Sequence, residues 1–378
     1  MNRTRFYVIA IFFVFFAGYA LPSFAEEQIL KIGIVHSVTG GSAALYGIEQ
    51  KNAIEMAIDE INESRMLGDI RVVGIHMDDG ADKAQTVNIF QRLINQDKVQ
   101  VILGASLATL SFAADPIAQA AGVPVIASSN TAAGITDIGN YIFRTSPPEN
   151  ILFPGVLAYA ERKYNIKKAA QLYGIDDQLM KSAYLIHKEA LAGAGIEVLL
   201  SETFNRGDVD FSAQLTKIKA AGPDVVVLGA LAEESANILY QARQLGIGDN
   251  VVFLGANAAI STKLFELAGP AANGFLVGAS WYAEYPSPKN QAFVAAYVKR
   301  YGHKPDVFGA QAYDAAYIVA EAVRRVGRTD DRKAIRDAIA ATRDFTGVIG
   351  KLSFSATREP IVTPKVLEAR GGSFVPAE

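Results

Sequence analysis

The sequence VILGASLATLSFAADPIAQAAGVPVIASSNT, residues 101–131, decides the fold. It begins with a β-branched run at 101–103 and contains a second apolar run at 123–127, with an alanine-rich helical stretch between them. Two apolar runs of strand length separated by one helix predict a βαβ unit. Because its strands are parallel, the loops that follow them, 104–109 and 128–131, emerge at the same carboxyl edge of the sheet.

These two loops carry small residues and hydroxyl groups. At the carboxyl edge of parallel strands, backbone N–H groups and hydroxyls can converge on a negative charge, so we predict a carboxylate cradle. The alternative is structural, because Ser and Thr at a helix start commonly cap its free N–H groups. A phosphate cradle is disfavoured, since neither loop contains the G-x-x-x-x-G-K-[ST] pattern or any Lys or Arg. The hydroxyls concerned belong to Ser106, Thr109, Ser128, Ser129 and Thr131.

The composition is that of a globular protein with more than one core. At 378 residues the chain is longer than most single cores, so two domains are expected. Hydrophobic residues make up 50% and charged residues 20%, which argues against disorder. The absence of cysteine excludes disulfides, thiol catalysis, Cys-ligated zinc and a lipidated N-terminal Cys.

The first residues have the pattern of a secretory signal peptide. Arg3 and Arg5 precede an apolar run at 6–20, and Ser23-Phe24-Ala25 provides small residues for cleavage, so we predict a signal peptide at 1–25. A membrane anchor is the alternative, but the apolar run is short for a bilayer span.

Cleavage after Ala25 leaves 34 basic and 39 acidic residues, because it removes two of the 36 Lys and Arg residues and no acid. The resulting net charge of −5 argues against a nucleic-acid surface. We therefore expect a mature protein that is monomeric, lies in the periplasm and is not inserted in the membrane.

Strand-like and helix-like segments alternate over 29–131 and again over 150–255, which is typical of doubly wound parallel sheets. Paired prolines at 147–148 interrupt this alternation, so we place a crossing between two lobes there. The predicted fold is α/β, with two doubly wound parallel-sheet lobes joined by a three-segment hinge. Crossings are expected near 145–148, 277–282 and 351–355, which assigns 26–145 plus 280–352 to lobe I and 146–279 plus 353–378 to lobe II.

The sequence lacks the signatures of an enzyme or of a metal site. The four histidines, His36, His76, His187 and His303, form no H-E-x-x-H motif, and no G-x-S-x-G elbow occurs. The acidic pairs at 78–79 and 176–177 are read as helix caps rather than metal ligands. We therefore expect no catalytic residue, no metal and no cofactor; a secreted hydrolase would need a nucleophile and a base that we do not find.

Several motifs in order give the chain a specific resemblance. They are ILKIGIV with TGG and YG near the start, GVPVI followed by a Thr after the cradle, DFSAQLTKIKAAGPDVV, QARQLGI, and AYDAAY near the end. From residue 29 to about 374 the chain resembles the leucine/isoleucine/valine-binding protein family, the periplasmic receptors of ATP-driven importers. The resemblance implies a small ligand captured by lobe closure and an inner-membrane ABC permease as partner.

The resemblance also implies ligand contacts. Tyr46 would close over the ligand from the first loop of lobe I. Ala108 and Thr109 would offer a backbone N–H and a hydroxyl to the ligand carboxylate. Ser129 and Thr131 would bind the α-substituent and the carboxylate from the second loop.

Three positions of lobe II depart from the family pattern. Where amino-acid binders of this family carry a Glu that pairs with the ligand ammonium, this chain has Asn257, in the motif FLGAN at 253–257. Gln178 and Leu231 stand where the family has a Tyr. Each of these changes alters the wall of the predicted ligand site.

An ammonium buried without its anionic partner would cost roughly 3 to 5 kcal/mol. We therefore predict a carboxylate ligand without an α-ammonium, an aromatic acid or a branched 2-oxo acid, to which Asn257 would donate. The alternatives are that another residue faces the ammonium or that Glu233, Glu234 or Glu284 supplies the counter-charge, which would make the chain a binder of leucine, isoleucine or valine. A ligand-sensing receptor domain on the same scaffold is a further alternative.

One aromatic pair lies at a predicted crossing. Trp281 and Tyr282 could stack on a ligand ring there, or they could pack the hinge.

Overall fold

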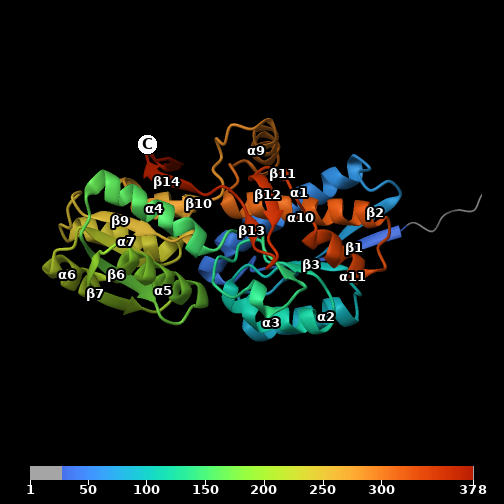
Figure 1. Ribbon diagram of the computed structural model, residues 1–378, viewed down its shortest axis with the longest axis horizontal. Coiled ribbons are helices and arrows are strands. Elements are labelled where there is room, and N and C mark those ends of the chain that lie inside the picture. The colour runs from blue at the N-terminus through green and yellow to red at the C-terminus, as the bar shows by residue number, and fades with distance from the viewer. Residues whose placement is uncertain (1–27, 378) are drawn as a thin grey trace, which may run out of the picture.

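The structure, a computed structural model, describes residues 28–377, and the signal peptide predicted at 1–25 lies outside the described residues. Figure 1 shows two α/β bodies joined along the long axis of the molecule. We call the body that contains the N-terminal strand lobe I and the other body lobe II.

Lobe I contains a five-stranded parallel sheet in the order β2-β1-β3-β4-β5. Ile32 lies opposite Val101 and Ile102 opposite Val125, so the predicted βαβ unit is confirmed. Strands β3 and β4 are buried throughout, as expected for a parallel sheet covered on both faces. The strands are β1 Gln28–His36, β2 Ile70–Asp78, β3 Val101–Gly104, β4 Val125–Ile126 and β5 Ile142–Phe143.

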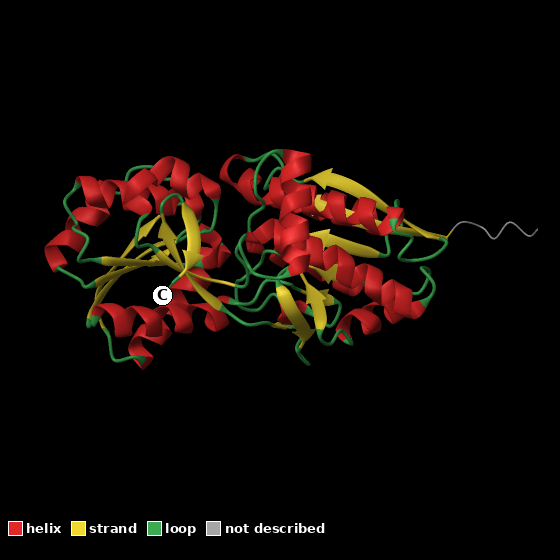
Figure 2. Cartoon of the chain, turned by 90° about the horizontal axis from the view of Figure 1, so that it is seen from above, coloured by secondary structure: helices red, strands yellow, loops and turns green. Residues whose placement is uncertain are grey.

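Helices cover both faces of this sheet (Figures 1 and 2). Helix α10 packs along α1, and α2 along α3. Helices α9 and α10 are separate, because Gly302 ends α9 in the left-handed conformation and Asp306 caps α10 through the N–H groups of Phe308 and Gly309. The helices are α1 Ala44–Glu63, α2 Lys83–Asn95, α3 Ala108–Ala120, α9 Pro288–Tyr301, α10 Val307–Val326 and α11 Arg332–Ala340.

Lobe II contains a seven-stranded sheet in the order β15-β14-β10-β9-β8-β6-β7, also with helices on both faces (Figure 2). Strands β14 and β15 form an antiparallel hairpin at its edge, β14 also pairs antiparallel with β10, and the strands from β10 to β7 pair in parallel. The strands are β6 Lys168–Gly174, β7 Glu197–Phe204, β8 Val225–Gly229, β9 Val252–Gly255, β10 Leu276–Ala279, β14 Lys365–Arg370 and β15 Ser373–Pro376. The helices are α4 Glu149–Tyr164, α5 Gln178–Gly193, α6 Ser212–Ala221, α7 Ala232–Gln244 and α8 Thr262–Ala268.

A small third sheet lies on the path of the third crossing. Its strands are β11 Phe345–Gly347, β12 Gly350–Phe354 and β13 Pro360–Ile361, and β12 pairs antiparallel with both of the others. Phe354 packs on Phe143 of lobe I, with ring centroids 5.4 Å apart. We therefore propose to place the third crossing after Ile361 rather than at 352/353.

Candidate functional site

The two predicted cradle loops lie against each other at the carboxyl edge of the lobe I sheet. Ser129 Oγ donates to the carbonyl oxygen of Ser106 at 2.7 Å, and Asn130 Nδ2 donates to that of Ala105 at 3.2 Å. Ser106 Oγ donates in turn to Gln50 Oε1 at 3.0 Å. All five residues are buried, so the loops form one packed polar unit.

The first loop offers main-chain donors at the start of α3. The N-cap residue Leu107 supplies no side-chain hydrogen bond, and the N–H of Ala108 has no partner within the helix. Thr109 Oγ1 instead donates to Asp177 Oδ2 at 3.1 Å and accepts from the Gln178 N–H at 3.2 Å. The Thr109 hydroxyl is thus engaged by lobe II, and it is the N–H groups of this loop that can face a carboxylate.

Tyr46 lies between the lobes. It belongs to α1 and is only 3% exposed. Its hydroxyl donates to the carbonyl oxygen of Ala258 at 2.9 Å and accepts from the Ala232 N–H at 3.1 Å. These partners directly follow Asn257 and Leu231, two of the predicted ligand residues. Burial raises the pKa of Tyr46, so the hydroxyl stays protonated.

Asn257 is held within lobe II by its side-chain amide. Its Nδ2 donates to the carbonyl oxygen of Gly278 at 3.0 Å, so one of its two amide N–H groups is used there. A backbone carbonyl requires a donor, which fixes the orientation of the amide. Its Oδ1 is buried and has no partner among residues 28–377. Asn257 can therefore only accept a hydrogen bond at that atom.

Glu149 connects the second cradle loop to Asn257, a role that sequence reasoning missed. Its N–H donates to the carbonyl oxygen of Thr131 at 3.2 Å, and its Oε2 accepts from the Asn257 N–H at 3.3 Å. His187 Nε2 lies 3.2 Å from its Oε1. The one available signal was position, since Glu149 is the first acidic residue after the predicted crossing at 147–148.

Two of the three acidic residues considered as alternative counter-charges have other partners, and the third, Glu233, stands in the first turn of α7. Glu234 Oε1 accepts from the Gly207 N–H at 3.0 Å. Glu284 forms an exposed ion pair with Lys304 at 2.7 Å. Of the contacts made by described residues, the carboxylate beside Asn257 is that of Glu149.

Buried polar atoms without a partner occur near the hinge. Within the described part of the chain these include Ser128 Oγ and Gln311 Oε1. Thr145 connects the main chains of these two residues, since its hydroxyl lies 3.0 Å from the carbonyl oxygen of Gln311 and 3.4 Å from that of Ser128. Leaving such atoms unpaired is costly, and a polar ligand that reached them would satisfy them.

A cavity of about 260 Å³ lies between the lobes, lined by residues that include Ile260 and Val307. Its walls come from both lobes and are rich in aromatic side chains, including Phe265 and Phe374 of lobe II. Trp281 and Tyr282 also line it, and the Trp281 indole N–H donates to Asn290 Oδ1 at 2.6 Å. The eight predicted ligand residues line neither this cavity nor the adjoining one of about 110 Å³. The indole is thus packed at the hinge and still faces an interlobe space.

Metal-ligand clusters and membrane-spanning helices are both absent from residues 28–377. No three His, Cys, Asp or Glu side chains in this range are grouped so that they could hold a metal ion. None of the helices described there has the length and hydropathy needed to cross a bilayer.

Comparisons with known proteins agree with this architecture. Residues 29–367 match the family described as periplasmic binding protein. The chain is 30% identical over 339 residues to the leucine-, isoleucine-, valine-, threonine-, and alanine-binding protein of Pseudomonas aeruginosa, covering 89% of this chain and 88% of that protein.

Solved structures show the same fold. A leucine binding protein from Thermotoga maritima has a TM-score of 0.86 at 26% identity, covering 92% of this chain and 98% of that chain. A solute binding protein of an ABC transporter from Rhodopseudomonas palustris, in complex with 3,4-dihydroxybenzoic acid, has a TM-score of 0.83 at 27% identity, covering 92% and 95%. These matches confirm the predicted two-lobe fold. The chain therefore belongs to the periplasmic binding protein family, of the leucine/isoleucine/valine-binding type.

Proposed function

We propose that this chain is a periplasmic solute-binding protein of an ABC importer, which captures a small carboxylate ligand by lobe closure and delivers it to an inner-membrane permease. The observation that carries the proposal is the Tyr46 hydroxyl, which bonds to main-chain atoms of Ala232 and Ala258 across the lobe boundary. A closing clamp needs such contacts, because they stabilise the closed state next to the enclosed ligand. The protein binds and carries; it has no catalytic role.

The ligand carboxylate is held by neutral donors in this proposal. The N–H groups at the start of α3, around Ala108, carry the partial positive charge of a helix N-terminus. The second loop adds Thr131 as a donor from the facing side, while Ser129, whose hydroxyl donates to the carbonyl oxygen of Ser106, can accept a hydrogen bond from the ligand. Gln178 and Leu231, which stand at the starts of α5 and α7, form the wall contributed by lobe II.

The ligand opposite Asn257 carries a hydrogen-bond donor in this proposal. The Asn257 Nδ2 is used by Gly278, so a ligand group that meets the free Oδ1 must present an O–H or N–H. A keto oxygen would meet another acceptor there. Of the two acid classes predicted from the sequence, this favours a hydroxylated aromatic acid over a 2-oxo acid. The Rhodopseudomonas relative, whose structure contains 3,4-dihydroxybenzoic acid, supports the choice.

A second candidate is a receptor for leucine, isoleucine or valine. Two observations favour it. The Pseudomonas relative is named for binding amino acids. The Glu149 carboxylate also lies beside Asn257, where an ammonium could approach it.

Titration of the mature protein distinguishes the two candidates. We would add leucine, 4-methyl-2-oxopentanoate and 4-hydroxybenzoate separately and follow Trp281 fluorescence and calorimetric heat. The proposal expects saturable binding of 4-hydroxybenzoate and none of leucine. Tight binding of leucine with no response to either acid would establish the second candidate instead.

A further inference from the structure

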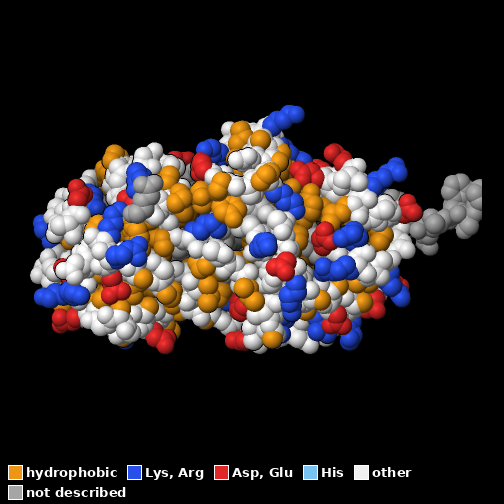
Figure 3. Space-filling model, turned by 45° about the horizontal axis from the view of Figure 1, so that its top comes forward, with side chains coloured by type: hydrophobic (Ala, Val, Ile, Leu, Met, Phe, Trp, Pro, Cys, Tyr) orange, Lys and Arg blue, Asp and Glu red, His pale blue; other side chains and the backbone are white. Residues whose placement is uncertain are grey.

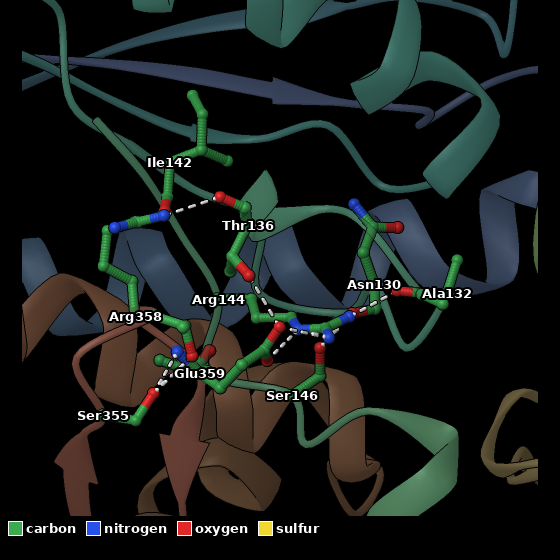
Figure 4. Close-up of polar contacts among 12 residues, drawn as sticks. Asn130, Ala132, Thr136, Ile142, Arg144, Ser146, Ser355, Arg358 and Glu359 are labelled. Carbon is green, nitrogen blue, oxygen red and sulfur yellow. Dashed lines mark hydrogen bonds and ion pairs between the residues drawn. The ribbon is translucent and has the colours of Figure 1, made fainter. Parts of the chain in front are cut away.

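Arg144 is a buried cation directly behind the second cradle loop. It follows β5 and is 1% exposed. Its Nη1 donates to the carbonyl oxygen of Asn130 at 2.9 Å and to that of Ala132 at 2.6 Å (Figure 4). Both residues flank Thr131, so one guanidinium group holds the main chain on each side of that predicted ligand residue.

Neighbouring residues hold the same stretch of backbone. Ser146 Oγ donates to the carbonyl oxygen of Asn130 at 2.8 Å, and the Glu149 N–H donates to that of Thr131 at 3.2 Å. Three consecutive carbonyl groups, 130 to 132, are thus bound by the first crossing. Their oxygens point toward that crossing, which leaves the Thr131 side chain as a polar group that this loop can offer a ligand, whereas the Ser129 hydroxyl donates to the carbonyl oxygen of Ser106.

The charge of Arg144 is met by Glu359, a residue distant in the sequence. Arg144 Nε lies 2.6 Å from Glu359 Oε2, and Nη2 lies 2.7 Å from Oε1. Thr136 Oγ1 donates to the same Oε1 at 2.7 Å. This bidentate geometry fixes the plane of the guanidinium and neutralises its charge. It is available to Arg but not to Lys.

Glu359 stands next to the third crossing. It precedes β13 Pro360–Ile361, after which the chain runs on to β14 in lobe II. Arg358 strengthens the attachment, since its Nη2 donates to the carbonyl oxygen of Thr136 at 2.8 Å. The ion pair therefore joins the second cradle loop, the first crossing and the third crossing in one hydrogen-bonded unit (Figure 4).

We propose that Arg144 and Glu359 are a positioning pair, which holds the Ser129–Thr131 loop in its ligand-binding shape and couples that shape to the third crossing of the hinge. The inference rests on the proposed function, because it gives the loop a ligand to bind. Neither side chain touches the ligand in this account; Arg144 acts through the carbonyls of Asn130 and Ala132. Movement of the hinge segment at 359–361 would reach the loop through the ion pair.

Glu359→Gln is the variant that tests the pair. It keeps the shape of the side chain but removes the charge and turns one acceptor into a donor facing the guanidinium. Glu321→Gln is a matched control, because Glu321 also pairs with an arginine, Arg324, at 2.8 Å and is 31% exposed against 25% for Glu359. Thr136→Val is a milder second variant, which removes one donor to the Glu359 carboxylate.

Two measurements separate positioning from simple stabilisation. Amide hydrogen exchange of the ligand-free proteins reports the loop directly. We expect faster exchange confined to the amides of 128–132 and the crossing at 359–361 in Glu359→Gln, a weaker change in Thr136→Val, and none in Glu321→Gln. The dissociation constant for 4-hydroxybenzoate, measured well below the melting temperature, should rise roughly 2- to 30-fold in Glu359→Gln.

Two results would overturn the proposal that Arg144 and Glu359 position the loop. One is amide exchange of the loop in Glu359→Gln that is equal to that of the wild type. The other is an unchanged dissociation constant in a Glu359→Gln protein whose melting temperature alone is lowered. If the wild type bound none of the tested acids, the proposed function would fail, and the exchange comparison would still decide whether the pair orders the loop.

Discussion

The Tyr46 hydroxyl oxygen lies 2.9 Å from the carbonyl oxygen of Ala258, and this hydrogen bond joins a helix of lobe I to a loop of lobe II. The same hydroxyl accepts from the Ala232 N–H, so one side chain contacts two loops of the opposite lobe. Part of the stability of the closed arrangement thus comes from the protein itself.

Tyr46→Phe should weaken ligand binding with little effect on folding. The change removes both cross-lobe hydrogen bonds and leaves the ring to pack on Phe308, 4.9 Å away between centroids. We expect a loss of about 1 to 3 kcal/mol in binding free energy. Calorimetric titration with 4-hydroxybenzoate checks the affinity and thermal unfolding checks the fold. Equal affinity in the two proteins would show that Tyr46 does not stabilise closure.

Thr131→Ala should weaken any carboxylate ligand by roughly 1 to 3 kcal/mol, because it leaves the carboxylate oxygens short of a donor. The backbone contacts of this residue, including the one from the Glu149 N–H, are unaffected by the change. Thr131→Ser keeps the hydroxyl and should recover most of the affinity. Titration of both variants with the same acid makes the comparison, and unaltered affinity in Thr131→Ala would place the cradle elsewhere.

Asn257→Asp should shift selectivity from acids toward amines. The new carboxylate repels a ligand carboxylate and attracts an ammonium, so the ratio of the leucine to the 4-hydroxybenzoate dissociation constant should fall by about tenfold or more. Asn165→Asp, at an exposed position in lobe II, adds the same charge and should leave the ratio unchanged. A ratio in Asn257→Asp equal to that of the wild type would mean that Asn257 does not face the ligand.

Asp314 should make stability depend on pH. Burial raises the pKa of Asp314 to about 7, although it accepts from the N–H groups of Val348 and Ile349. The folded state then binds the proton more tightly than the unfolded state, whose Asp titrates near 3.8. The contribution is therefore full below about pH 4 and is lost as the pH rises to about 7, with a slope of at most about 1.4 kcal/mol per pH unit.

Denaturant unfolding of the wild type and of Asp314→Asn across pH 4 to 8 checks this prediction, since the difference between the proteins isolates Asp314 from other groups. The free energy of unfolding of the wild type should fall relative to the variant as the pH rises. Parallel curves would contradict the raised pKa.

Much of the architecture could be predicted because hydrophobic periodicity, and the residues that end helices and strands, are local features of the sequence. The apolar run at 101–103 lies within β3, the run at 123–127 contains β4, and the alternation expected over 150–255 includes α5. The short α8 and α11 were not predicted. Their positions are fixed by packing against neighbours such as α7 and α10, which no local pattern records.

The candidate site was predictable in position and less so in chemistry. Loop order alone places Ser129 near Ser106, because parallel strands share an edge. The partners of Asn257 could not be read from the sequence, since Gly278 and Glu149 are 21 and 108 residues away from it. For the same reason the unpartnered acceptor at Asn257 Oδ1 could not be predicted from the sequence.

The three hydrogen-bonded carbonyl groups at 130 to 132 also affect how the ligand specificity of such a binding protein can change. Because the peptide groups are fixed by residues behind the loop, a substitution at 131 should alter the side-chain chemistry of the loop without disturbing the path of the chain. New specificities can then arise by exchanging side chains on an unchanged framework, whereas replacing Arg144 would compromise every one of them at once.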